Sequence, residues 1–280
     1  MSQSKKYPKF SVLISVYRKE NPKYLDLALK SIEQQTVKPS EIILVEDGVI
    51  PDRLQEVILN HKEKFGNGFK IIYSSINRGL GNALRLGTNY VSTNWIARMD
   101  SDDYSVPNRF EQQLDLIIDR PNLAVVGGQV DEFSKNINNI VGFRKVPSTT
   151  ELIYKFAKWR SPFNHPTVMI NKKALKAVGG YQDFGNLEDY YLWVRFLTRD
   201  FDVCNVPETL VLMRVDSGLY LRRGKINNLR YFYKLRYYLK HKRLINTFEE
   251  LLGDFIVTVN IIMPGRMRKY IYTNFLHTNS

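Results

Sequence analysis

Three carboxylates stand within four positions of one another, at Asp100, Asp102 and Asp103, directly after the apolar run Trp95–Met99. A single acid would be enough to cap a helix that begins near Pro107. Three acids held together repel one another unless a positive charge joins them, and hard cations such as Mg²⁺ and Mn²⁺ prefer oxygen ligands. Because an ion held by one or two carboxylates commonly completes its coordination with phosphate oxygens, the cluster predicts a nucleotide or diphosphate substrate.

The elements that must position this cluster are short apolar strands that alternate with amphipathic helices. The expected strands are Phe10–Val16, Glu41–Glu46, Lys70–Ser74, Trp95–Met99, Ala124–Gly127 and Thr167–Ile170. The expected helices follow Asn21-Pro22, Asp47-Gly48 and Pro107, and cover Gly81–Tyr90, Lys172–Val178 and Asp189–Thr198. This alternation predicts a mostly parallel sheet that is covered by helices on both faces.

Polar side chains follow four of the expected strands at their carboxyl ends. They are Ser15 with Tyr17, Glu46 with Asp47, Asn77 with Arg78, and the aspartates that begin at Asp100. Since ligands of open α/β sheets bind outside the carboxyl ends of the strands, we expect these side chains to line one crevice. The run Arg78–Leu84 is only a weak match to a dinucleotide-binding loop, because Leu84 stands where that motif needs Gly or Ala.

Composition and charge limit the possible classes of protein. A chain of 280 residues with 44% hydrophobic residues can form one large folded domain with an appendage. Cys204 is the single cysteine, so a disulfide framework is excluded and a core position is expected. The N-terminal lysines are not followed by a cleavable apolar segment, so secretion is not expected. The net charge is +13, and from Arg214 onward 13 Lys or Arg stand against 4 Asp or Glu, which indicates an anionic partner surface, either nucleic acid or lipid headgroups.

Five sequence blocks occur in a defined order and spacing. They are SVLISVYRKE, SIEQQTVKPSEIILVEDG, NRGLGNALRLG, ARMDSDDYSVPNRFEQQ and VGGYQDFGNLEDYYLWVR. From about Phe10 to about Arg223 they make the chain resemble the inverting family 2 glycosyltransferases, particularly bacterial enzymes that build repeat units of capsule, exopolysaccharide or lipopolysaccharide. The resemblance implies an α/β fold of the GT-A type, which is a Rossmann-like, mostly parallel sheet flanked by helices.

The same resemblance implies a role for most of the polar strand ends. The implied nucleotide-binding residues are Ser15, Val16, Tyr17, Glu20, Glu46, Asp47, Arg78, Gly79, Gly81, Asp100 and Ser101. Among these, Asp47 or Glu46 would accept a hydrogen bond from the base, although the family usually has aspartate at both positions. Asp102, supported by Asp100, would bind Mn²⁺ or Mg²⁺, so the carboxylates are tolerated together because the ion and its diphosphate neutralise them.

The pair Glu188 and Asp189 matches the acid pair on the acceptor side of the family's site. An inverting transfer is a single displacement, so it needs one base to take the proton of the acceptor hydroxyl, and the resemblance favours Asp189 for this role. The alternative is that both acids merely favour the positive end of a helix dipole. His165 has a hydrogen-bonded structural role as its commoner explanation, with metal or acceptor contact as the other. Arg214, together with Arg222 and Arg223, either clamps the diphosphate or is solvated.

The resemblance thus predicts a metal-dependent enzyme that moves a sugar from a nucleotide-diphosphate sugar to a saccharide or polyprenyl-linked saccharide, and it favours a UDP-linked donor. A sugar-1-phosphate nucleotidyltransferase is a second class, but it would carry a glycine-rich loop after the first strand, where Tyr17–Glu20 contains no glycine. A nucleic-acid-binding protein is a third class, which the basic and tyrosine-rich C-terminal part suggests. Because we favour the glycosyltransferase, we expect no nucleic-acid partner.

We expect a catalytic domain over residues 1–218 and a basic, aromatic-rich helical extension over residues 219–280. On a helix, five residues of this extension would share a face: Leu229, Phe232, Tyr233, Arg236 and Leu239. Aromatic and cationic side chains suit the headgroup region of an anionic bilayer, which predicts peripheral attachment. Packing of the helix on the catalytic domain is the alternative. Because related enzymes commonly extend lipid-linked sugars, we expect a cytoplasmic protein at the cytoplasmic face of the inner membrane.

Overall fold

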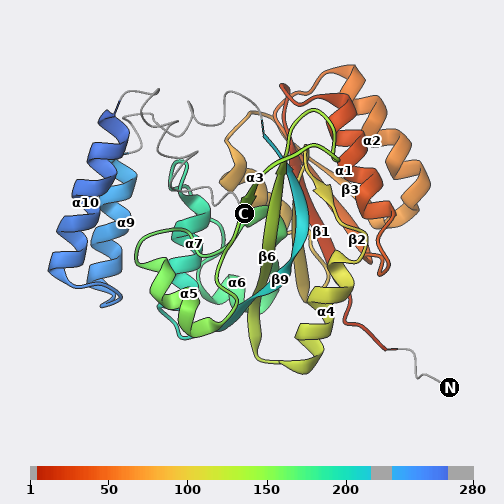
Figure 1. The fold of residues 1–280 in the computed structure, drawn as a ribbon. Coiled ribbons are helices and arrows are strands. Elements are labelled where there is room, and N and C mark those ends of the chain that lie inside the picture. Colours follow the sequence, from red (N-terminus) through yellow and green to blue (C-terminus); the bar gives the residue numbers. More distant parts are fainter. Residues whose placement is uncertain (1–4, 216–228, 264–280) are drawn as a thin grey trace.

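The computed structural model describes residues 5–215 and 229–263, and a mixed sheet lies at its centre (Figure 1). Within these residues nine strands pair in the order β3-β2-β1-β4-β8-β6-β9-β5, and β7 pairs with β6. The strands are β1 (Phe10–Val16), β2 (Glu41–Asp47), β3 (Phe69–Ser74), β4 (Trp95–Asp100), β5 (Tyr104–Ser105), β6 (Leu123–Phe133), β7 (Ile140–Arg144), β8 (Met169–Asn171) and β9 (Asp202–Arg214).

The first four of the predicted strands form a parallel sheet, as the alternating pattern indicated. β1 lies between β2 and β4 and is parallel to both, and β3 pairs with β2. In this register Ser15 stands opposite Asp100 of β4, and Val16 stands opposite Glu46 of β2. The carboxyl ends of three strands therefore meet at one edge of the sheet, which is the edge that carries the polar side chains.

The second half of the sheet differs from the predicted one. β8 runs antiparallel between β4 and β6, so it joins two blocks of strands instead of extending a parallel sheet. β6 is longer than predicted and pairs with β9, where no strand was expected. Pro207 and Glu208 interrupt the apolar pattern of β9, and the pairing shifts in register at this point. The interruption removes the periodic signal while the long-range pairing on either side keeps the strand in the sheet.

Helices cover both faces of the sheet. They are α1 (Pro22–Glu33), α2 (Asp52–Phe65), α3 (Leu80–Thr88), α4 (Arg109–Asp119), α5 (Thr150–Ala157), α6 (Lys172–Ala177) and α7 (Glu188–Leu197). One core contains side chains of α1, α2 and α4, and the other contains side chains of α3, α5, α6 and α7. The Asn21 side chain caps α1, Pro22 begins it, and the predicted apolar face is buried. Cys204 is buried in the first core, as expected.

Two further helices, α9 (Leu229–His241) and α10 (Thr247–Ile262), lie side by side at the edge of the molecule (Figure 1). α9 packs on α7, because Leu235 and Leu239 share a cluster with Tyr190 and Val194. Arg236 and Leu239 are buried as their spacing indicated, whereas Tyr233 is 40% exposed. The expected domain boundary at 218/219, and with it Arg222 and Arg223, lies outside the described residues.

In the described part of the chain, we find no helix with the length and hydrophobicity that a transmembrane segment requires.

Candidate active site

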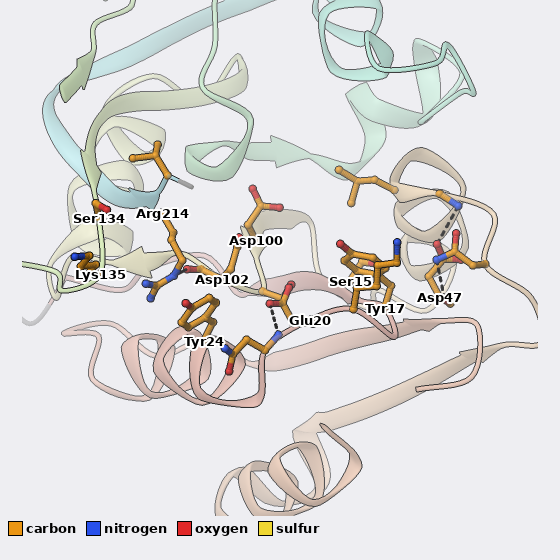
Figure 2. A pocket seen from close by; sticks show the side chains of 17 residues that line it. Ser15, Tyr17, Glu20, Tyr24, Asp47, Asp100, Asp102, Ser134, Lys135 and Arg214 are labelled. Carbon is orange, nitrogen blue, oxygen red and sulfur yellow. Dashed lines mark hydrogen bonds between the residues drawn. The ribbon is translucent and has the colours of Figure 1, made fainter. Parts of the chain in front are cut away.

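A cavity of about 810 Å³ opens at the carboxyl ends of β1, β2 and β4 (Figure 2). Its lining residues come from these strand ends, from the start of α1, from the β6–β7 hairpin and from the end of β9. They are Ser15, Tyr17, Lys19, Glu20, Asn21, Tyr24, Asp47, Asn77, Gly79, Leu80, Asp100, Ser101, Asp102, Ser134, Lys135, Arg214 and Val215. Figure 2 shows Ser15, Tyr17 and Asp47 gathered toward one end and Arg214, Ser134 and Lys135 toward the other. The predicted convergence on one crevice is confirmed for Ser15, Tyr17, Asp47, Asn77, Asp100 and Asp102, whereas Glu46 and Arg78 do not line this cavity.

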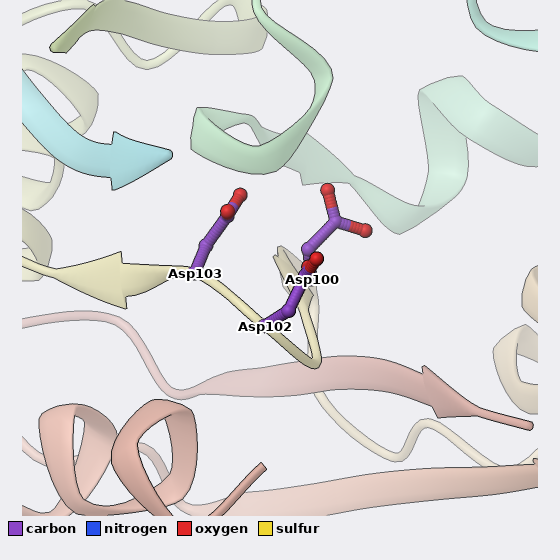
Figure 3. A group of neighbouring side chains, drawn as sticks. All are labelled: Asp100, Asp102 and Asp103. Atoms are coloured by element: carbon purple, nitrogen blue, oxygen red, sulfur yellow. The ribbon is translucent and has the colours of Figure 1, made fainter. Parts of the chain in front are cut away.

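Asp100, Asp102 and Asp103 form a compact acidic cluster between these two ends (Figure 3). Each offers a carboxylate oxygen, and these oxygens lie within 4.8 Å of one another. The buried guanidinium of Arg98 donates from both of its terminal nitrogens to the Asp100 carboxylate, and Nη1 lies 2.5 Å from Oδ2. Because side chains two positions apart on a strand share a face, β4 itself places this cation beside the acids.

Burial and mutual repulsion disfavour the ionised forms of the carboxyl groups in this cluster. Burial, helped by the charges of Asp100 and Glu20, raises the pKa of Asp102 to about 7. Burial raises the pKa of Asp103 well above its usual value, and its Oδ2 has no hydrogen-bond partner in the part of the chain that the structure describes. Three oxygen donors of this kind fit a hard divalent cation, which would favour their ionised forms. The donor set thus agrees with the Mn²⁺ or Mg²⁺ site that the sequence predicts.

Arg214 ends β9 beside the acidic cluster. Its backbone N–H donates to Asp103 Oδ1 over 2.8 Å, and its Nε–H donates to the carbonyl oxygen of Asp102 over 3.1 Å. The guanidinium carbon lies 3.7 Å from the ring centre of Tyr24 and 4.5 Å from that of Phe133. Nη1 is buried without a hydrogen-bond partner among the described residues. Arg214 is therefore a fixed cation of the cavity and not a solvated charge of the C-terminal part.

Asp47 organises the loop between β3 and α3. Its two carboxylate oxygens accept from the backbone N–H groups of Arg78 and Gly79, over 2.8 and 2.9 Å. Gly48 has a φ of +85°, and a Cβ at this position would lie 2.8 Å from the backbone nitrogen of Asn77. Glycine after Asp47 is thus required both by the left-handed backbone and by the close approach of the loop.

The structure places the other predicted nucleotide-binding residues in different surroundings. Glu20 accepts from the Ser101 hydroxyl, and both line the cavity. The Val16 side chain is buried in the core. Glu46 is 4% exposed, and burial raises its pKa. Arg78 lines a second cavity of about 510 Å³, which shares Asp47 with the first.

Glu188 and Asp189 are the first two residues of α7, which approaches α3 closely. A Cβ built on Gly81 would lie 3.4 Å from both Cβ and Cγ of Glu188, so glycine lets the two helices meet. Burial, and then the neighbouring charge of Asp189, raises the pKa of Glu188 to about 7. Glu188 Oε2 has no hydrogen-bond partner within the described ranges. The charge of Arg98 opposes this rise in the pKa of Glu188. Arg98 therefore acts electrostatically on the acid pair as well as on the acidic cluster, where it binds Asp100.

His165 is buried beside the same arginine. Its Nε2 lies 3.2 Å from the Tyr181 hydroxyl, and its ring meets the Trp193 ring edge to face. Burial, and then the charge of Arg98, lowers the pKa of His165 well below its usual value. A neutral, hydrogen-bonded histidine in this position fits the structural explanation of this residue.

A protein-family model with the description Glycosyl transferase family 2 matches residues 11–179 of this chain. The matched region is more than half of the chain, and it includes the three strand ends and the acidic cluster. The chain belongs to this family. An uncharacterized glycosyltransferase of Haemophilus influenzae is 39% identical over 96% of this chain and 99% of its own length. The Escherichia coli UDP-Gal:alpha-D-GlcNAc-diphosphoundecaprenol beta-1,3-galactosyltransferase is 34% identical over 95% of both chains.

Comparison with solved structures supports the GT-A fold of this family 2 glycosyltransferase. A mannosyltransferase of Pyrobaculum calidifontis in complex with GDP-Man and Mn²⁺ superposes with a TM-score of 0.64. The match covers 96% of this chain and 79% of the other, at 11% sequence identity. At this low identity the likeness concerns the fold alone.

Several residues in or beside the glycosyltransferase cavity were not predicted from the sequence. Arg98 could have been found, because it precedes Asp100 by two positions on a predicted strand. Tyr24 lies in the predicted first helix, but no spacing relates it to Arg214. Ser134 and Lys135 follow the part of β6 that extends beyond the expected strand Ala124–Gly127, and no strand was expected at β7. These residues reach the cavity only through long-range pairing of β6 with β9.

Proposed function

We propose that this family 2 glycosyltransferase transfers a sugar, with inversion, from a UDP-sugar to a lipid-linked saccharide diphosphate in the synthesis of a surface polysaccharide. The observation that carries the proposal is one cavity of about 810 Å³, which is lined by the strand ends Ser15, Asp47 and Asp100 together with Asp102 and Arg214. The Escherichia coli relative, named for UDP-Gal and GlcNAc-diphosphoundecaprenol, supports this choice of donor and acceptor because the similarity extends over 95% of both chains.

The end of the cavity near β1 and β2 suits the nucleoside. Tyr17 is 43% exposed and offers an aromatic face to a base, while Ser15 offers a hydroxyl. Asp47 already accepts two backbone hydrogen bonds, but an ionised carboxylate has further lone pairs that can accept from a pyrimidine N–H. Gly79, where α3 begins, has no side chain to obstruct the ligand. In this arrangement Arg78 acts through its backbone, because its side chain faces the neighbouring cavity.

The diphosphate would lie at the acidic cluster. Asp102, with Asp103 or Asp100, would hold Mn²⁺ or Mg²⁺, which when bound offsets the negative charge that develops on the leaving diphosphate. Arg98 holds the Asp100 carboxylate in place through both terminal nitrogens. Arg214 is fixed by Tyr24, Phe133 and Asp103, so its guanidinium can bind phosphate oxygens without reorganising. The charges of the chain are therefore arranged around the group that departs.

The acceptor hydroxyl must lose a proton as it attacks the anomeric carbon. We assign this role to Asp189, and we assign to Glu188 the role of holding a second charge close to it. Both acids begin α7, which Gly81 allows to lie against α3. The bond from the anomeric carbon to the diphosphate breaks, the bond to the acceptor oxygen forms, and the proton passes to the Asp189 carboxylate.

A nucleotide screen followed by an activity assay tests the proposal. With Mn²⁺ present, UDP and one UDP-sugar should raise the thermal unfolding temperature, because a ligand of the folded state stabilises it by mass action. That UDP-sugar should release UDP only when a GlcNAc-diphosphate carrying a short lipid is added. Asp102→Asn should abolish the release, whereas Glu151→Gln, a change of an exposed acid on α5, should leave it intact. Release of pyrophosphate from a nucleoside triphosphate and a sugar phosphate, without UDP release, would contradict the proposal.

A further inference from the structure

The outer face of α10 carries a continuous row of exposed apolar side chains, here named the apolar stripe. It consists of Phe248, Leu251, Leu252, Phe255, Ile256, Val259 and Ile262, which are between 38% and 72% exposed. Steps of three and four residues place these side chains on one side of a helix. Figure 1 shows that α10 lies at the outer edge of the molecule, where no other described element covers this side. A large row of apolar side chains that is exposed to solvent indicates an interaction surface.

The opposite face of α10 is held firmly against the rest of the protein. Arg236 of α9 donates to the carbonyl oxygens of Glu249, Glu250 and Lys158, so one buried cation joins α9, α10 and the end of α5. Gly253 makes this approach possible, because a Cβ there would lie 2.0 Å from the Arg236 guanidinium carbon. The orientation of the apolar stripe away from the protein is thus fixed by the fold.

The acids of α10 do not give this surface a negative charge. Glu249 pairs with Lys158 over 2.8 Å, Glu250 pairs with Lys240 over 2.5 Å, and Asp254 Oδ1 lies 3.8 Å from Nε of Arg236. The exposed charges of the two-helix unit are instead cations, namely Arg230, Lys234, Lys242 and Arg243. In sequence, residues 264–280 directly after α10 add three Lys or Arg and contain no Asp or Glu. The surroundings of the apolar stripe therefore favour an anionic partner.

We infer that the apolar stripe docks on an anionic lipid bilayer, with α10 lying flat in the headgroup region. The 16 residues of α10 are about 24 Å long, which is short of the roughly 30 Å hydrocarbon core and suits insertion along the surface. A second copy of this chain would bring two like-charged extensions together, which opposes self-association through this face. The sequence predicts membrane contact through the residues that form α9. Because α9 packs on α7, the inferred lipid-facing helix is α10 instead.

The functional role of bilayer docking by the apolar stripe rests on the proposed lipid-linked acceptor. Docking would hold the enzyme on the bilayer in which such an acceptor is embedded. Binding of α10 to lipid, however, depends on the surface alone and can be measured without any sugar transfer. Failure of the docking inference and failure of the proposed function are therefore distinguishable.

Flotation with lipid vesicles tests the inference. The full-length protein should float with vesicles of phosphatidylcholine containing phosphatidylglycerol, and raising the salt concentration should weaken this binding. Phe248→Glu together with Phe255→Glu should reduce the bound fraction by about tenfold or more, because charges on the inserted face must be dehydrated. Leu59→Glu, a change of an exposed apolar residue on α2, is the matched control and should bind as the wild type does. Unchanged thermal unfolding of the double variant should show that it is folded.

Two further measurements sharpen the result. Phe255→Trp should keep vesicle binding, and its fluorescence should shift to shorter wavelength when anionic vesicles are added, as expected for a ring that enters the headgroup region. The double glutamate variant should retain wild-type turnover on a water-soluble acceptor with a short lipid. Equal flotation of the double variant and the wild type would overturn the inference. A wild-type dimer in lipid-free buffer that the double variant converts to a monomer, without vesicle binding, would assign the apolar stripe to a second copy and would also overturn it.

Discussion

Arg98 is the residue on which the arrangement of the acids depends most closely. It is buried, it holds Asp100 with two hydrogen bonds, and its charge reaches Asp102, Asp103 and Glu188. These carboxylates thus share Arg98 as a counter-ion that belongs to the protein itself, in addition to Arg214. This explains how an acidic cluster can be built into the folded chain before any ligand arrives.

Replacement of Arg98 by Met should therefore cost stability. Removing one partner of a buried ion pair leaves the other charge uncompensated, for which we expect a loss of about 3–5 kcal/mol in the free energy of unfolding. Urea unfolding at pH 8 measures this loss, and the exposed Arg53→Met on α2 is the control. Adding Asp100→Asn to Arg98→Met should restore part of the stability. Equal stability of Arg98→Met and the wild type would contradict the role of Arg98 as counter-ion.

The assignment of the base within the acid pair makes a second prediction at this scale. Asp189→Asn should lower turnover by about 10²–10⁴-fold at every pH, because the proton acceptor is lost. Glu188→Gln resembles the protonated acid, so at pH 8 it should have the lower turnover that the wild type reaches below pH 7, and still exceed Asp189→Asn. In the wild type, activity should fall as the pH drops through about 7, where Glu188 becomes protonated, and Glu188→Gln should lack this step. Rate profiles against pH for the three proteins decide the matter, and an inactive Glu188→Gln beside an active Asp189→Asn would reverse the assignment.

The grouping of individual residues was predictable where the residues are adjacent in sequence, as in the acidic cluster and the acid pair at α7. The meeting of the strand ends from Ser15 to Asp100 was predictable because parallel strands bring their carboxyl ends to one edge. Arg214 was open to two explanations, because its partners Tyr24 and Phe133 lie far away in the chain. Contacts formed by packing leave no local pattern in the sequence.

At the scale of elements, the parallel part of the sheet followed from hydrophobic pattern alone. β1, β2, β3 and β4 are apolar runs, and the first three are each followed by an amphipathic helix, while the short strand β5 stands between β4 and α4. β9 was not predictable in this way, since Pro207 and Glu208 break its pattern and its partner β6 is distant in sequence. The short strand β8 looked like a parallel strand, but its direction depends on the path of the chain and not on its residues.

Gly253 provides a prediction about the attachment of α10. Alanine in a helix is normally more stable than glycine by about 1 kcal/mol. Here a Cβ would lie 2.0 Å from the Arg236 guanidinium carbon, so this side chain would have to leave its buried hydrogen bonds. We expect Gly253→Ala to lower the free energy of unfolding by about 1–3 kcal/mol.

Chemical denaturation measures this change, with Ile256→Ala on the exposed face of the same helix as the control. A Gly253→Ala protein that is more stable than the wild type would show that helix propensity exceeds the clash. The buried Arg236 would then not be what fixes α10.

At the scale of the whole molecule, the cavity makes stability depend on pH. Burial raises the pKa values of Asp102 and Glu188 to about 7, and it raises those of Asp103 and Glu46 as well. Between the ordinary carboxyl range and pH 7 the folded protein therefore holds more protons than the unfolded chain does. Where the folded state binds more protons than the unfolded state, the free energy of unfolding falls as the pH rises. The contribution of these groups to stability is therefore greatest below the ordinary carboxyl range and is lost as the pH rises to about 7 and above.

We expect the unfolding temperature in metal-free buffer to be higher at pH 5.5 than at pH 8. Asp102 and Glu188 should each contribute on the order of 1–3 kcal/mol to the difference. The double variant Asp102→Asn with Glu188→Gln should show a flatter dependence. Mn²⁺ with UDP should stabilise the wild type more at pH 8 than at pH 5.5, because protons compete with the metal for the same carboxylates. A pH dependence that the double variant leaves unchanged would contradict this account.

The stereochemistry of the product tests the central claim most directly. Nuclear magnetic resonance of a reaction that contains the active α-linked UDP-sugar, Mn²⁺ and the GlcNAc-diphosphate acceptor follows both the nucleotide and the new anomeric proton. A single displacement assisted by Asp189 predicts that UDP appears in step with a β-linked product, and that Asp189→Asn forms both at least about 10²-fold more slowly. An α-linked product, or a β-linked product formed at the wild-type rate by Asp189→Asn, would contradict the account.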